Sequence, residues 1–179
     1  FDVSTTNPAS MAFTTCVVNV VENDRCENAK RVSVGSVCSS VGGDGTYATQ
    51  SPLATCTGNA NDDVWYKFTA TQSTHFISVT PSLTYDPVVQ VFKDCATPLP
   101  APNVFCKDTD YPKGTPGSTK VSGLSPGTTY YYRVYDNAAT NPATMGFSTC
   151  VTALPENDDC ANAKTVYPGP TCSEIVGNG

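Results

Sequence analysis

The sequence predicts an all-β protein, a disulfide-stapled antiparallel β-sandwich that occurs in tandem repeats. Three observations predict this fold class. The chain is rich in Thr, Val, Tyr, Gly, Pro, Asn and Ser, which favour strands and tight turns, and poor in strong helix formers. It holds 9 cysteines in 179 residues. Its last segment repeats its first.

The repeat is visible when the sequence is aligned with itself. Residues 135–179 match residues 1–45 without a gap, at an offset of 134, and 23 of the 45 pairs are identical. Tandem copies of one unit produce such a pattern. We therefore expect 1–21 to be the C-terminal strand of a preceding repeat, 22–155 one complete repeat, and 156–179 the start of a following repeat.

The linker between repeats is short. Three or four residues separate the last expected strand of one repeat from the start of the next, and they include the apolar or stiff pairs Val20-Val21 and Leu154-Pro155. Such a linker favours neighbours that abut over neighbours that swing on a flexible tether. The expected assembly is a rod, in which each repeat adds roughly 35–50 Å.

Apolar runs predict the strands in order. They lie at residues 32–37, 64–68, 76–79, 88–92, 121–124, 130–134 and 145–151, separated by clusters of Gly, Pro, Asn and Ser. Seven or more short strands in one repeat indicate a two-sheet sandwich. One helical turn is expected after Asn23 or Asp24, because this pair suits a helix cap.

Alternation along the strands predicts which side chains are buried. Trp65, Tyr66 and Phe68 are expected to supply much of the core. Lys67 and Arg133 lie within alternating runs, so we expect both to face water.

The cysteines indicate disulfides and export, since they lack the paired C-x-x-C spacing of zinc sites. The complete repeat contains six: Cys26, Cys38, Cys56, Cys95, Cys106 and Cys150. We expect Cys95 to pair with Cys106 across a proline-rich loop. We expect Cys38 to pair with Cys56 around a Gly/Ser/Thr-rich excursion. Cys26 is left with two partners: Cys150 of the same repeat, which we favour, or Cys16 of the preceding one.

Charge and hydropathy exclude several functions. The net charge is −6, from 16 acidic and 10 basic residues, which argues against binding nucleic acid or an anionic membrane. No run approaches the roughly 18 apolar residues of a membrane span. The negative charge favours cations as small partners.

Catalysis is not expected. His75 is the only histidine, and it begins an alternating run, which predicts a strand-edge or surface position. A general base also needs a nucleophile and an orienting carboxylate nearby, and the sequence offers no such set. We expect no enzyme activity.

Calcium is the one candidate cofactor. Hard oxygen donors gather at Asn23, Asp24, Asp62 and Asp63, and such oxygens suit calcium. The same residue types are ordinary in turns and caps, and no EF-hand spacing occurs. Both interpretations stay open.

Three motifs carry a family resemblance: ENDRCENA at residues 22–29, DDVWYKF at 62–68 and LSPGTTYYYRVY at 124–135. In combination they resemble the extracellular repeat domains of very large Bacteroidota surface proteins, such as gliding-motility adhesins and other proteins exported by the type IX secretion system. They are also similar to the prepeptidase C-terminal type of jelly-roll sandwich, which some secreted hydrolases carry. The third motif alone is similar to fibronectin type III domains.

The resemblance implies a structural and adhesive role at the cell surface. A stiff extracellular filament or adhesin would have neighbouring repeats, and surface glycans, as its partners. The alternative is a carbohydrate- or substrate-binding accessory module of a secreted hydrolase. A filament needs many tandem copies, whereas an accessory module needs one or a few.

Overall fold

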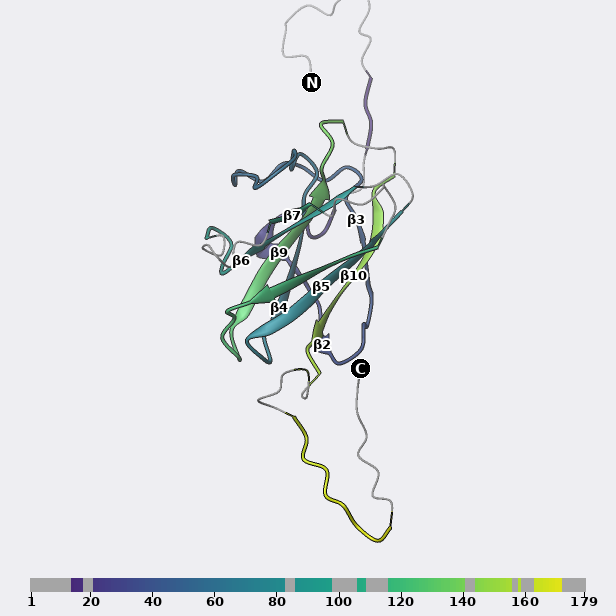
Figure 1. Ribbon diagram of the computed structural model, residues 1–179. Coiled ribbons are helices and arrows are strands. Elements are labelled where there is room, and N and C mark those ends of the chain that lie inside the picture. The colour runs from purple at the N-terminus through teal and green to yellow at the C-terminus, as the bar shows by residue number, and fades with distance from the viewer. Residues whose placement is uncertain are drawn as a thin grey trace, which may run out of the picture.

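The computed structural model describes residues 14–17, 21–82, 86–97, 106–108, 116–140, 144–155, 158 and 163–171. In this part of the chain, ten strands form two sheets that make a sandwich (Figure 1). The one helical element among these residues is a single 3₁₀ turn, η1 (Cys26–Asn28). The all-β prediction is confirmed.

Each sheet combines strands from distant parts of the chain. The first sheet has the order β1-β4-β9-β6-β7, with β1 (Lys30–Arg31), β4 (Val64–Thr69), β9 (Thr129–Asp136), β6 (Pro87–Phe92) and β7 (Cys106–Asp108). The second sheet has the order β2-β10-β5-β8, with β2 (Val34–Gly35), β10 (Gly146–Ala153), β5 (Thr74–Pro81) and β8 (Gly117–Ser122). β3 (Val41–Asp44) also pairs with β10.

Both sheets are mixed, whereas the sequence predicted antiparallel pairing throughout. β1 runs parallel to β4, and β2 runs parallel to β10. The reason is that residues 30–35 cross from the edge of the first sheet to the edge of the second. The buried side chain of Val32 lies between these two short strands and belongs to the main core. The predicted single strand at 32–37 is therefore wrong.

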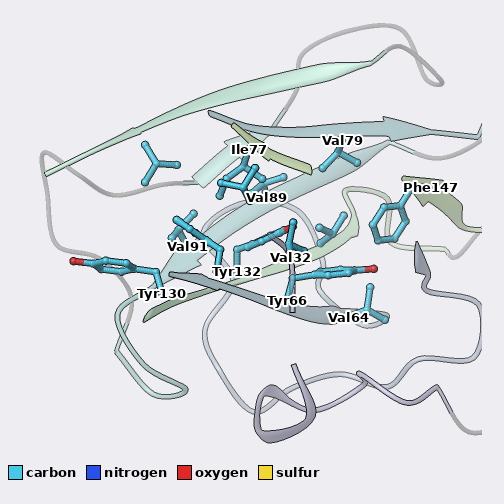
Figure 2. Packing of buried hydrophobic residues seen from close by; sticks show 14 of the residues in the cluster. Val32, Val64, Tyr66, Ile77, Val79, Val89, Val91, Tyr130, Tyr132 and Phe147 are labelled. Atoms are coloured by element: carbon cyan, nitrogen blue, oxygen red, sulfur yellow. The ribbon is translucent and has the colours of Figure 1, made fainter. Parts of the chain in front are cut away.

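The main core lies between the sheets and takes alternate residues of their strands. Tyr66 of β4 and Tyr132 of β9 are register partners, and their rings stack with centroids 5.2 Å apart. Figure 2 shows them beside the valines of β6 and the apolar residues of β5. Trp65 is equally buried, but it lies in a separate cluster on the outer face of the first sheet.

The expected capping role of the Asn23-Asp24 pair is wrong. The residue that precedes η1 is Arg25, and no side chain caps the turn. The Asn23 amide instead donates to the carbonyl of Trp65 (2.9 Å), and the Asp24 carboxylate accepts from the backbone and hydroxyl of Thr49. Both side chains thus attach the first residues of the repeat to later segments.

The chain enters and leaves the sandwich at opposite ends. β10 starts near the end of β3, since Gly146 pairs with Asp44, and it finishes at Ala153 beside the start of β5. We name the end of the sandwich where β10 starts the leading end, and the end where β10 finishes the trailing end. In Figure 1, the described segment 14–17 lies beyond the leading end and the segment 163–171 beyond the trailing end.

The predicted partial repeats fall mostly outside the described residues. Of residues 1–21 the structure describes 14–17 and Val21, and of residues 156–179 it describes Asp158 and 163–171. Val17 is 97 % exposed, whereas its counterpart at offset 134, Val151, is 0 % exposed within β10. The difference follows from the neighbours, because β10 is flanked by strands of its own sheet on both edges.

Candidate functional site

The outer face of the first sheet carries the densest polar network of the described residues. Trp65, Gln90 and Arg133 come from adjacent strands and point away from the main core. Backbone from residues 49–57 and the turn η1 cover this face. The alternating pattern predicts that Arg133 on this face meets water, but residues 49–57 and η1 form a second layer that buries these side chains.

Arg133 organises this layer and is 0 % exposed, so the prediction that it faces water is wrong. Its guanidinium donates to Gln90 Oε1 from Nε (3.0 Å) and Nη2 (2.6 Å), and to the carbonyl of Ala54 (2.7 Å). Nη1 lies 3.4 Å from Asp63 Oδ2, in an ion pair with both side chains buried. Lys67, predicted to face water as well, is only partly exposed.

Aromatic rings surround the same guanidinium. Its central carbon lies 5.3 Å from the ring centroid of Tyr135, 5.4 Å from that of Phe92 and 5.8 Å from that of Trp65. Distances under about 6 Å allow cation–π attraction, which is stronger when the cation is desolvated. The arginine is thus held by charge, hydrogen bonds and ring faces together.

Asp63 fastens the covering loop from the other side. Its carboxylate accepts from the backbone of Ser51 (2.8 Å) and from the Ser51 hydroxyl. The same hydroxyl oxygen accepts from the indole N–H of Trp65 (2.9 Å). The loop at 49–57 is therefore attached to the sheet by polar contacts at both Ser51 and Ala54.

Two of the three disulfides, Cys26–Cys95 and Cys56–Cys106, add to this attachment, and all three expected pairings are wrong. The bonds are Cys26–Cys95, Cys38–Cys150 and Cys56–Cys106. The prediction paired cysteines that bracket one loop, or the first and last strands. The bonds instead join segments that pass over the sheets to the strands and turns beneath, across separations of 69, 112 and 50 residues. Cys16, the alternative partner of Cys26, is an exposed free thiol.

A pocket of about 350 Å³ opens beside this network. Residues 24–27 line one side and residues 49–53 the other, with Trp65 and Cys95 completing the wall. Both charge signs, hydroxyls and an amide meet an apolar surface there, and the volume suits a small polar molecule. None of the lining residues is a histidine, so the pocket offers no imidazole base.

The four candidate calcium ligands have separate partners. Asn23, Asp24 and Asp63 make the contacts described above, and Asp62 Oδ1 accepts from the backbone of Asp136 (3.1 Å). In the described part of the chain, no three His, Cys, Asp or Glu side chains form a group that could hold a metal ion. The structure therefore does not assemble the predicted calcium set.

Asp62 differs from the other three candidate calcium ligands. Burial raises the pKa of Asp62 to about 7, and the nearby charges of Asp136 and Asp63 add to the rise. Its Oδ2 is buried and has no hydrogen-bond partner among the described residues. The folded state therefore favours the protonated, neutral form of this carboxyl.

The Asp62→Asn variant is expected to raise the melting temperature more at pH 8 than at pH 5. The pKa of Asp62 rises on folding from 3.8 to about 7. Between these values the folded state binds the extra proton, so the stability of the parent falls as pH rises towards 7. Asparagine carries no charge and removes this loss. Thermal melts from pH 5 to pH 8 test it.

Asp94→Asn is the matched control, because Asp94 is exposed. Hydrogen bonds from the Ala96 backbone and Thr97 lower the pKa of Asp94, so no gain at high pH is expected there. A lower melting temperature of Asp62→Asn at pH 8 would contradict the prediction. That result would mean that the ionised carboxylate stabilises the fold, as a calcium ligand does.

His75 lies neither at a sheet edge nor on the surface, so the predicted position of this residue is wrong. It is 0 % exposed, because β5 lies between β10 and β8 and this side chain points inward. Its Nε2 accepts from the backbone of Thr71 (3.0 Å) and of Gln72 (3.3 Å), which organises the turn before β5. Burial lowers the pKa of His75. The neutral imidazole thus has a structural role.

Sequence reasoning missed the residues that build the outer layer, Arg133, Gln90 and Ser51. A signal was present, since a strand that alternates aromatic residues with one arginine can be covered on both faces. The cysteines of the 38–56 excursion were a second signal, because disulfides can hold a segment with few apolar residues on a sheet.

A family model for galactose-binding domain-like modules associated with the type IX secretion system matches residues 22–149. The chain belongs to this family. The galactose-binding domain-like module is also similar to the pre-peptidase C-terminal domain of a collagenase from Bacillus anthracis. That structure is 12 % identical, with a TM-score of 0.40, over 69 % of this chain and 93 % of the other. No curated protein matches the chain.

The family indicates where the module works. Association with the type IX system marks a secreted or cell-surface protein, and galactose-binding-like domains are non-catalytic accessory modules. Among the described residues, no helix is long and apolar enough to cross a membrane.

Proposed function

We propose that this module is a structural and adhesive repeat of a large secreted cell-surface filament or adhesin. One observation carries the proposal. The Asp24 backbone donates to the Val21 carbonyl (3.2 Å), and the Asp158 backbone donates to the Pro155 carbonyl (3.1 Å). The two bonds are separated by the sequence offset of 134. Equivalent backbone hydrogen bonds thus precede and follow the sandwich.

The positions of the two turns favour a stiff array. One precedes the sandwich and the other follows the trailing end of β10, so copies joined through them would stack head to tail. Val21 also packs against the main core, which ties the linker to the copy that follows it. A heterologous, head-to-tail contact of this kind generates a filament when its rotation does not close into a ring.

The length of tandem chains tests the proposal. The full chain is compared with chains in which residues 22–155 are duplicated or triplicated. We expect the maximum dimension from small-angle X-ray scattering to grow by roughly 35–50 Å for each added copy. Growth with only the square root of copy number would indicate flexible tethers and contradict the stiff array.

The pocket beside Trp65 favours a second function, the binding of surface glycans. Its volume and its mixture of charged, hydroxyl and apolar groups fit one sugar ring. Glycan-array binding by the full chain would support this function if Gln50→Ala weakened it. Thr55→Ala, outside the lining of that pocket, is the control.

A further inference from the structure

Tyr47 is a bulky residue in a backbone conformation that disfavours it. It is the third residue of a turn closed by a hydrogen bond from the Ala48 backbone to the Gly45 carbonyl (2.9 Å). Its φ is +69°, the only positive φ at a non-glycine position in the described residues. Turns with a positive φ at this position strongly prefer glycine or asparagine.

The turn at residues 125–128 shows the usual solution. Its hydrogen bond runs from the Thr128 backbone to the Ser125 carbonyl (3.1 Å), and its third residue is Gly127, with φ +83°. A side chain at such a position clashes with its own backbone. Tyr47 therefore carries a conformational cost that Gly127 avoids.

The Tyr47 ring contributes little to the stability of this repeat. The side chain is 70 % exposed, and the ring belongs to none of the buried clusters. The turn is held by other residues: Thr46 accepts from the Met145 backbone (3.1 Å), and Asp44 accepts from the Thr46 backbone (2.8 Å). A strained and exposed aromatic residue points to a contact outside this repeat.

The surroundings of Tyr47 place that contact at the leading end. The turn directly follows β3, and with Val21, Glu22 and Asp44 it lines a depression of about 510 Å³. Val21 is the residue directly before the expected repeat 22–155. The end of the linker, at Val21, therefore lies beside Tyr47.

The sequence repeat indicates which segment would occupy this depression. At offset 134, Val17 corresponds to Val151 in the last strand, β10. Three residues separate Val17 from Val21, and the four Cα–Cα steps between them span at most about 14 Å. The last strand of a preceding copy thus ends within about 14 Å of Val21.

We infer that Tyr47 and the depression around it are the docking surface for the trailing end of the preceding copy of this repeat. The inference rests on the proposed function and names the surface through which it is achieved. The ring would cover the end of the neighbouring sandwich, and the energy of this contact offsets the unfavourable φ.

The test uses the full chain with residues 22–155 duplicated, so that two complete copies are joined by the natural linker. We expect ¹⁵N relaxation to show both copies tumbling as one body. Tyr47→Asn in the downstream copy should shorten the rotational correlation time towards the value of the single-copy chain. The same substitution in the upstream copy is the control, because only the incomplete preceding repeat adjoins it.

A second measurement separates docking from folding. In the single-copy chain, Tyr47→Asn should leave the melting temperature unchanged or raise it, since asparagine tolerates the turn. A lower melting temperature would overturn the inference by making Tyr47 part of the fold. Loss of glycan binding by this variant would also overturn it, in favour of a sugar platform.

The two proposals fail differently. If the parent two-copy chain tumbles as two independent bodies, the stiff array fails and the docking surface with it. If the two copies tumble together and Tyr47→Asn in the downstream copy changes nothing, only the docking surface fails.

Discussion

Replacing Cys38 and Cys150 together by serine is expected to lower the melting temperature by about 15 °C. Their disulfide closes the longest loop of the three, with a separation of 112 residues. Restricting the unfolded chain over such a loop contributes about 5 kcal/mol in the chain-entropy model. For a domain of this size each kcal/mol corresponds to about 3–4 °C.

The fold explains why this bond has a large effect. Cys150 lies within β10, and Cys38 follows the two-residue strand β2, which pairs with β10. The next strand, β3, contains two glycines and pairs with β10 as well. Strands this short hold weakly by themselves, so the disulfide keeps the β2–β3 segment on the sheet.

Cys16→Ser is the matched control, because Cys16 is an exposed free thiol. We expect its melting temperature to equal that of the parent chain. Differential scanning calorimetry compares the three proteins, and peptide mapping without reductant identifies the bonds. An unchanged melting temperature of the double variant would show that the bond does not stabilise the fold.

The sequence predicted the sheet architecture well wherever strands alternate strongly. The runs that became β4, β5, β6, β9 and β10 were all found from period-two or continuous apolar patterns, whereas the run predicted at 121–124 covers only the last two residues of β8. β3 was missed because Gly42 and Gly43 give no apolar signal. Gly43 is nevertheless required, since a Cβ there would lie 2.0 Å from the Tyr66 hydroxyl oxygen. β7 has only three residues, too few for a period to be visible.

The site was less predictable, because it depends on contacts between distant segments. Alternation correctly placed Arg133 on the face opposite Tyr132, but it could not show that residues 49–57 cover that face. Six cysteines allow fifteen pairings, and neither proximity in sequence nor the expected pairing of first and last strands chose the right ones. In this fold the bonded pairs belong to segments that lie 50 to 112 residues apart in sequence, so spacing alone carries no pairing signal.

Arg133→Met is expected to destabilise the protein by about 3–5 kcal/mol. Methionine fills much of the same volume but leaves the buried carboxylate of Asp63 without its ion pair. Gln90 Oε1 loses its donors as well, and the Ala54 carbonyl keeps only the longer hydrogen bond from Gln90 Nε2 (3.5 Å). Urea unfolding, followed by the fluorescence of Trp65, measures the loss. Arg31→Met is the control, since Arg31 is exposed on β1, and less than about 0.5 kcal/mol is expected there.

The covering loop gives a second, local readout. Without the guanidinium, the backbone at Ala54 is no longer attached to β9, so residues 49–57 should be cleaved by a broad-specificity protease under conditions in which the sandwich stays folded. Adding Asp63→Asn to Arg133→Met removes the unpaired charge and should recover part of the stability, but not the protection of the loop. If Arg133→Met behaves like Arg31→Met in both assays, Arg133 does not hold the outer layer in place.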